Sequence, residues 1–159
     1  DVAIRVGTPP DTAVARRLGM SEQWVVAAAS YMKSRDPSDG LAHHDVILQI
    51  QDGVRLDPAA VLPAHIADTL RVRLISDDLE TVADAVRMGL GVAAMPAWLA
   101  SPEVDTGALA RLPIALDARV PVYAHLVAGR GSNRRARAFV DTLVDELSGA
   151  FRCPDPERT

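Results

Sequence analysis

Four carboxylates stand close together near the middle of the chain: Asp77, Asp78, Glu80 and Asp84. Such a group could hold a cation or supply an acid and a base. Its surroundings offer a simpler role, because Asp77 precedes Glu80 by three residues, the spacing of a capping box. Apolar residues then recur at helical spacing, namely Val82, Ala83, Val86 and Leu90. We therefore predict that these carboxylates cap a helix and face the positive end of its dipole.

A pair of adjacent histidines, His43 and His44, precedes Asp45 and is a second candidate for metal or catalytic chemistry. Adjacent side chains point in different directions on any regular element, so the two imidazoles would need distant partners to share one ion. The other histidines, His65 and His125, stand alone. Hydrogen bonds in a loop or cap are the simpler role, and we predict no metal site.

A basic, glycine-rich segment at 129–135 (GRGSNRR) resembles a phosphate-binding loop but lacks the lysine and the glycine spacing of that motif. The Gly89-x-Gly91 pair lies between a helix and a strand, whereas the dinucleotide fingerprint lies between a strand and a helix. The chain has no G-x-S-x-G elbow. Cys153, the only cysteine, stands near the end of the chain without a neighbouring base. We predict no catalytic residue and no cofactor.

Composition narrows the class of protein. The chain has 159 residues and a formal net charge of −4, with 48% hydrophobic residues. A negative charge argues against a nucleic-acid surface as the main feature, since phosphate contacts call for excess lysine and arginine. No apolar run approaches the roughly 20 residues of a membrane span, and one cysteine excludes an internal disulfide. We expect a cytoplasmic globular domain with no membrane contact.

The clearest element pattern is a strand, a helix and a second strand. Residues 70–75 alternate apolar and basic side chains, as in a half-exposed strand. The helix that follows ends at Gly89, a natural C-terminal stop, and 91–95 (GVAAM) is an apolar strand. Together they predict a βαβ unit in a parallel or mixed sheet.

Further strands are predicted at 1–7, 24–29, 46–50 and 120–127, with a short helix at 30–34. The first is expected to be buried on both faces, as in a parallel sheet. An amphipathic helix is predicted to start at Ser132 or Asn133 and to reach Leu147. Its apolar face is expected to consist of Ala136, Phe139, Val140, Leu143, Val144 and Leu147. The segment 57–70 stays ambiguous, because two prolines interrupt its helical turn.

Seven stretches in this order resemble the effector-binding domain of LysR-type transcriptional regulators, where the effector is the small molecule that controls the regulator. The strongest stretch is the GLGVAAMP block before Trp98, followed by a Gly-Ala-Leu turn. The seven are DVAIRVG (1–7), ARRLG (15–19), VVAAASYM (25–32), DGLAHHDVI (39–47), SDDLETVADAVRMGLGVAAMP (76–96), TGALARL (106–112) and RARAFVDTLVDEL (135–147). The resemblance covers nearly the whole chain.

The resemblance implies an α/β fold like the type 2 periplasmic binding proteins, with two lobes joined by crossovers near 20–26 and 117–122. Residues 1–20 and 121–148 would form the remainder of lobe I, residues 21–120 lobe II, and 149–159 a C-terminal tail. Lobe I would be incomplete, because the chain starts where the family's third strand starts. The family's winged helix-turn-helix would then precede this chain.

The resemblance also implies a function: a small metabolite held in a cleft between the lobes would modulate DNA binding by a homodimeric or homotetrameric full-length protein. Its pocket residues, carried over by position, are Ile4 and Val6 on lobe I and Ser30, Gln49, Gln51, Asp77 and Leu79 on lobe II. A departure from the family is Ala28-Ala29, which replaces the usual Ser-Pro. The acidic 77–80 turn predicts that strongly anionic effectors are disfavoured.

Two other function classes stay open. A solute-binding protein of a transporter would share the architecture, and it would need an export signal upstream. An enzyme built on the same fold is the third class, with His44 and Asp45 as the first residues to test. No motif in the sequence calls for such an enzyme.

Overall fold

The structure is a computed structural model. It describes residues 2–6, 14–33, 35–36, 41–51, 54–55, 70–114, 116, 119–126 and 134–147. The chain forms two compact units. Unit 1 combines Asp1–Glu22 with Arg119–Thr159, and unit 2 is the continuous stretch Gln23–Ala118. No helix in the described ranges is long and apolar enough to span a membrane.

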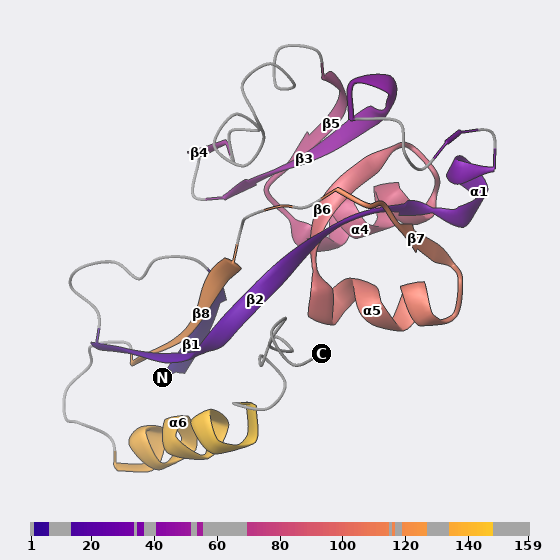
Figure 1. The fold of residues 1–159 in the computed structure, drawn as a ribbon. Helices are drawn as coiled ribbons and strands as arrows, with labels where there is room; N and C mark the ends of the chain where they lie inside the picture. The colour runs from indigo at the N-terminus through magenta and orange to yellow at the C-terminus, as the bar shows by residue number, and fades with distance from the viewer. Residues whose placement is uncertain are drawn as a thin grey trace. The chain divides into compact units, whose positions relative to one another are not determined.

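The described residues of unit 1 form three antiparallel strands and one helix (Figure 1). The strand order is β1, β8, β2, so that Val122 of β8 lies opposite Val6, and Tyr123 lies opposite both Arg5 and Arg17. The elements are β1 (Val2–Val6), the first part of β2 (Val14–Ala28), β8 (Arg119–Leu126) and α6 (Arg134–Leu147).

The core of unit 1 lies between the sheet and α6. Its buried residues are Leu18, Val122, Ala124 and Val140. The predicted amphipathic helix is confirmed, and Leu143, Val144 and Leu147 pack against this core as expected. Phe139 departs from the expected apolar face, because 53% of it is exposed.

The prediction that β1 is buried on both faces in a parallel sheet is wrong. β1 pairs antiparallel with β8, and Ile4 is 52% exposed. Within the described ranges β8 is the strand that β1 pairs with, so β1 stands at the edge of the order β1-β8-β2. A run of apolar residues alone does not distinguish an edge strand from a central one.

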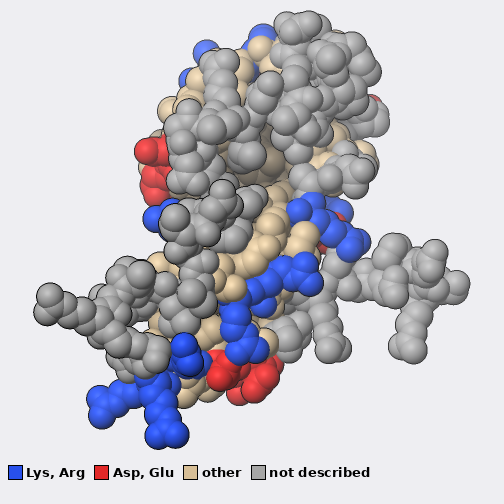
Figure 2. Space-filling view, turned by 90° about the vertical axis from the view of Figure 1, so that its left-hand side faces the viewer, with Lys and Arg blue, Asp and Glu red and all other residues tan. Residues whose placement is uncertain are grey.

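Charged side chains of both signs lie on the face shown in Figure 2. In unit 1, Arg16 of β2 forms an ion pair and hydrogen bond with Asp141 of α6. Arg5 and Arg17 are also exposed. The pairing of Arg16 with an acidic residue of α6 links the sheet to its helix at the surface.

Unit 2 is a mixed sheet with helices (Figure 1). β3 is parallel to both β5 and β6, and the second part of β2 is antiparallel to β6 and β7. The predicted βαβ unit is confirmed as β5-α4-β6. The elements are α1 (Ala29–Met32), the 3-10 helix η1 (Leu41–His43), β3 (Asp45–Gln51), β4 (Val54–Arg55), β5 (Arg71–Ser76), α4 (Leu79–Arg87), β6 (Val92–Pro96), α5 (Ala97–Asp105) and β7 (Leu109–Arg111).

Two apolar clusters make up the core of unit 2. One places Ile47 of β3 and Met95 of β6 with Val82 and Val86 of α4. The other places Val25 of β2 with residues that include Tyr31, Met32, Leu41 and Val92. Helix α4 buries the residues that the helical spacing assigned to its apolar face, Val82, Ala83 and Val86, together with Ala85. Leu90, the last residue of that series, is 41% exposed and follows the helix.

Four elements of the described residues, and part of a fifth, were not predicted: η1, β4, α5, β7 and the first half of β2. Pro102 lies inside α5, and a proline there is typical of a turn. Three predicted segments lie outside the described residues: 57–69, the 129–133 loop with its Ser132 or Asn133 cap, and the 149–159 tail with Cys153.

Candidate functional site

Two parallel strands of unit 2 end side by side next to the start of a helix. Gln49 of β3 lies opposite Ser76, the last residue of β5. Helix α4 begins at Leu79, three residues after that strand ends. In open α/β sheets, ligands bind outside the carboxyl ends of the strands. We call this place the strand-end site, and define it by Gln49, Gln51, Ser76, Asp77 and Leu79.

Asp78, and not Asp77, caps helix α4. Its Oδ2 accepts hydrogen bonds from the Thr81 backbone N–H at 2.8 Å and the Thr81 hydroxyl at 2.6 Å. The Asp78 backbone N–H donates to the Ser76 hydroxyl at 3.1 Å. The predicted capping box of Asp77 with Glu80 is therefore wrong. The sequence pattern fits either of the two consecutive aspartates as the cap. In the structure the Thr81 backbone N–H and hydroxyl both donate to Asp78, which makes Asp78 the capping residue.

The hydrogen bond from the Thr81 hydroxyl, with that from its backbone N–H, lowers the pKa of the Asp78 carboxyl below its ordinary value of 3.8. A depressed pKa in the folded state stabilises the fold above that ordinary value, and this stabilisation is lost as the pH falls through the folded-state pKa. Asp78→Ala is therefore expected to lower the urea midpoint at pH 7 and to have a smaller effect at pH 3.

The matched control for this prediction is Asp78→Asn, which keeps an oxygen acceptor for the cap but does not titrate. Its urea midpoint is expected to lie between those of wild type and Asp78→Ala at pH 7. If the difference between wild type and Asp78→Ala is the same at both pH values, the carboxylate form of Asp78 does not stabilise α4.

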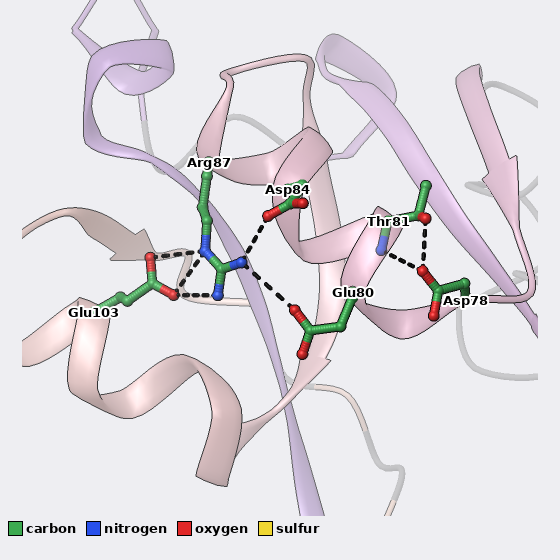
Figure 3. Close-up of polar contacts among 6 residues, drawn as sticks. All are labelled: Asp78, Glu80, Thr81, Asp84, Arg87 and Glu103. Atoms are coloured by element: carbon green, nitrogen blue, oxygen red, sulfur yellow. Dashed lines mark hydrogen bonds and ion pairs between the residues drawn. The ribbon is translucent and has the colours of Figure 1, made fainter.

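Two carboxylates of the acidic cluster, those of Glu80 and Asp84, lie beside Arg87 (Figure 3). Arg87 donates to Glu103 of α5 at 2.7 and 3.0 Å and to Asp84 at 2.8 Å, and its Nη1 lies 3.8 Å from Glu80. Hydrogen bonds to Glu103 and then to Asp84 raise the pKa of Arg87. The cluster thus ties α4 to α5. Within the described ranges, no group of three or more acidic, histidine or cysteine side chains could hold a metal ion.

The second candidate motif lies at the start of β3, with His44 buried and His43 exposed. His43 ends η1, and His44 is fully buried with its ring 5.9 Å from that of Tyr31. Asp45 begins β3, and its backbone N–H donates to the Tyr31 hydroxyl at 3.0 Å. His44 itself lies in the turn between η1 and β3, as expected, and its backbone N–H donates to the Leu41 carbonyl at 3.0 Å. The burial of its imidazole was not expected.

The structure places some of the predicted effector residues together and separates others. Gln49 is half-buried in β3, Asp77 is exposed after β5, and Leu79 is half-buried at the start of α4. Gln51 is the last residue of β3, and its side chain lies outside the described part of the structure. Ser30 is not with them: it lies in α1, at the end of the sheet where β3 begins.

The two predicted effector residues of unit 1 both lie in β1. Ile4 lies opposite Ala124 and is half-exposed. Val6 lies opposite Val122 and packs against the core of unit 1. Part of the Val6 side chain therefore serves packing.

Sequence reasoning missed Ser76 as a member of the strand-end site. A serine that ends a strand and is followed by Asp-Asp is a common start of a helix, so its type alone did not single it out. The signal that could have found it is its register, because it lies opposite Gln49 across the parallel pair. Register between β3 and β5 cannot be counted from the sequence, since the chain between them has no recognisable pattern.

Comparisons with known proteins agree on one family. The model of the LysR substrate binding domain matches residues 1–148. The regulatory domain of CrgA, a LysR-type transcriptional regulator from Neisseria meningitidis, is 27% identical with a TM-score of 0.77; the alignment covers 92% of this chain and 75% of that domain. The comparison with curated proteins gives no match.

Two more distant structures share the fold. The regulatory domain of HypT from Salmonella typhimurium is 21% identical with a TM-score of 0.70, covering 94% of this chain and 73% of that one. Full-length AphB from Vibrio cholerae is 21% identical with a TM-score of 0.66, covering 92% and 52%. This chain thus spans about half the length of that full-length regulator. It has the type 2 periplasmic-binding-like α/β fold, and it belongs to the LysR substrate-binding domain family.

Proposed function

We propose that this chain binds a small metabolite at the strand-end site and thereby controls a DNA-binding regulator. The observation that carries the proposal is the register of Gln49 opposite Ser76 at the carboxyl ends of two parallel strands, next to the start of α4. The family match supports it and favours a regulator over the solute-binding protein of a transporter. The family is one of regulator domains, and we assign no catalytic step to this chain.

The side chains at this edge favour polar ligands without strong negative charge. An amide such as that of Gln49 both donates and accepts hydrogen bonds, and a serine hydroxyl does the same. Asp77 and Asp78 lie beside them, and the Asp78 carboxylate already accepts a hydrogen bond from the Thr81 backbone N–H at the helix start. A dicarboxylate placed here would therefore meet the like charges of both aspartates.

Control of the regulator would follow from a shift between two arrangements of the domain. A ligand can shift such an equilibrium only by its difference in affinity for the two arrangements. In the full-length protein, we propose that a winged helix-turn-helix binds DNA in the cytoplasm and that a homodimer or homotetramer relays the shift. The lobe boundaries named above, and the contribution of Ile4 and Val6 to the pocket, stay predictions.

Benzamide and succinate test the charge preference, since one is neutral and the other is a dicarboxylate. Benzamide is expected to move the amide resonances of Gln49, Ser76 and Asp77 at lower concentration than succinate does. Gln49→Ala is expected to weaken benzamide binding about fivefold, because one hydrogen bond is lost. Thr106→Ala, an exposed polar truncation after α5, serves as the control and is expected to bind like wild type. Tighter binding of succinate at these amides would contradict the proposal.

A further inference from the structure

Unit 2 contains a cavity at the end of the sheet opposite the strand-end site. Its volume is about 650 Å³, within the range of small-molecule sites. Asp45, the first residue of β3, lines it, whereas Gln49 lies four residues along the strand, roughly 13 Å away at the usual rise. The lining residues are Ser30, Tyr31, Arg35, Asp45, Arg73, Met88, Gly89 and Leu90.

Arg73 lines this cavity and lies at an irregularity in the sheet. Val46 lies opposite Val72, but the next residue, Ile47, lies opposite Leu74. This shift leaves Arg73 opposite no residue of β3, as in a β-bulge. A β-bulge changes the direction in which a side chain points, and bulges are common next to functional sites. The side chain of Arg73 is 67% exposed, so its donors can reach a ligand.

The cavity is lined by two arginines, Arg35 and Arg73. Arg73 makes a long contact with a carboxylate, and Arg35 contacts an aromatic ring and a backbone carbonyl. Arg73 and its neighbour Arg71 lie 3.6 and 3.5 Å from the same oxygen of Asp45, longer than a charge-assisted hydrogen bond. Arg35 stacks on the Tyr31 ring at 3.8 Å and donates to the Tyr31 backbone carbonyl at 3.2 Å. Two guanidinium groups against one carboxylate give the lining a net positive charge.

One wall of the cavity is apolar and exposed. Met88 and Leu90, which follow α4, are 78% and 41% exposed. Between them, Gly89 has a positive φ of 76°, and an added Cβ there would lie 3.7 Å from the Ser30 hydroxyl oxygen. This glycine therefore leaves open the space between the apolar wall and a hydroxyl that can donate to an anion.

We propose that this cavity is a second ligand site of unit 2, selective for a small organic acid. Arg35 and Arg73 would bind the carboxylate, Ser30 would donate a further hydrogen bond, and Met88 and Leu90 would cover the apolar body. The proposal goes beyond the strand-end site, which has the opposite charge preference. A planar guanidinium binds a carboxylate with two parallel hydrogen bonds, which explains why arginine suits this role.

The test is a separate titration of the full chain with each of three ligands: benzoate, benzamide and inorganic phosphate. Binding is monitored by the backbone amide chemical shifts. Benzoate is expected to move the resonances of Ser30, Gly89 and Leu90. Benzamide has the same ring without the charge, and phosphate has charged oxygens without the apolar body, so both are expected to bind here at least tenfold more weakly. Equal binding of benzamide or of phosphate at these amides would overturn the proposal.

Variants separate a specific site from general attraction. Arg73→Gln, at an exposed position, and Arg35→Gln are each expected to weaken benzoate binding about tenfold. Lys33→Gln is the matched control: it removes the same charge from an exposed residue outside the lining and is expected to bind like wild type. Asp45→Asn removes the competing carboxylate and is expected to bind benzoate more tightly. Equal weakening by Lys33→Gln and Arg73→Gln would overturn the proposal. Shifts at Gln49 and Ser76 report the strand-end site separately.

Discussion

Gly91→Ala is expected to lower the free energy of unfolding by about 3 kcal/mol, in the range measured for overpacked cores. A Cβ at this position would lie 2.3 Å from the backbone carbonyl oxygen of Asp45 and 2.8 Å from its carbon. These atoms belong to the start of β3 and cannot rotate away as a side chain can. The new methyl group would therefore push β3 from β6, and urea denaturation would show the loss.

Gly107→Ala separates this clash from backbone strain. Gly107 has a positive φ of 75°, and an added Cβ there would meet no atom within 4 Å. Its replacement is expected to cost about 1 kcal/mol, the strain of a left-handed conformation alone. If Gly91→Ala loses no more stability than Gly107→Ala, the close approach of 91 to Asp45 is not tight in solution.

Ile47→Ala is expected to cost about 2–5 kcal/mol, as for other large-to-small changes in well-packed cores. Ile47 is 1% exposed and lies on β3, between β5 and β6. It packs in the same cluster as Val82 and Val86 of α4 and Met95 of β6. The cavity left by the missing methyl and methylene groups can close only if α4 moves toward the sheet.

Ile47→Val is the graded control, with an expected loss of about 1 kcal/mol. Successive alternate residues of a strand share a face, so Gln49 extends from the same face of β3 as Ile47. Benzamide binding at the strand-end site is therefore expected to weaken in Ile47→Ala and to be kept in Ile47→Val. A loss of stability below 1 kcal/mol in Ile47→Ala would show that α4 is not packed tightly on β3.

The fold was predictable where short-range rules decide it. Strand β5, helix α4, its stop at Gly89 and strand β6 all follow from periodicity and turn chemistry within about 25 residues. Helix α5 was not predictable, because Pro102 and Ser101 are typical of a turn and only packing of Ala100 in the core decides otherwise. The family assignment came from blocks spread along the whole chain, and the family match confirms it.

The candidate site was predictable only in part. Gln49 and Asp77 follow from the family resemblance, and the register of β3 with β5 puts Gln49 opposite Ser76, the residue before Asp77. The choice of Asp78 over Asp77 as the cap depends on the geometry of Thr81, which spacing does not give. The second cavity could not be predicted, because its lining comes from separate segments and includes a bulged arginine.

The discontinuous make-up of unit 1 has a consequence for synthesis on the ribosome. Unit 2 is one uninterrupted stretch, so all its contacts are available before β8 and α6 emerge. The pairing of β1 forms later, because its partner β8 is made after the whole of unit 2. The entropy lost in closing so long a loop grows only with the logarithm of its length, and prior folding of the inserted stretch shortens the effective loop further. Once Ala118 has left the ribosome and β8 has not, unit 2 is thus expected to be folded while β1 still lacks its neighbour.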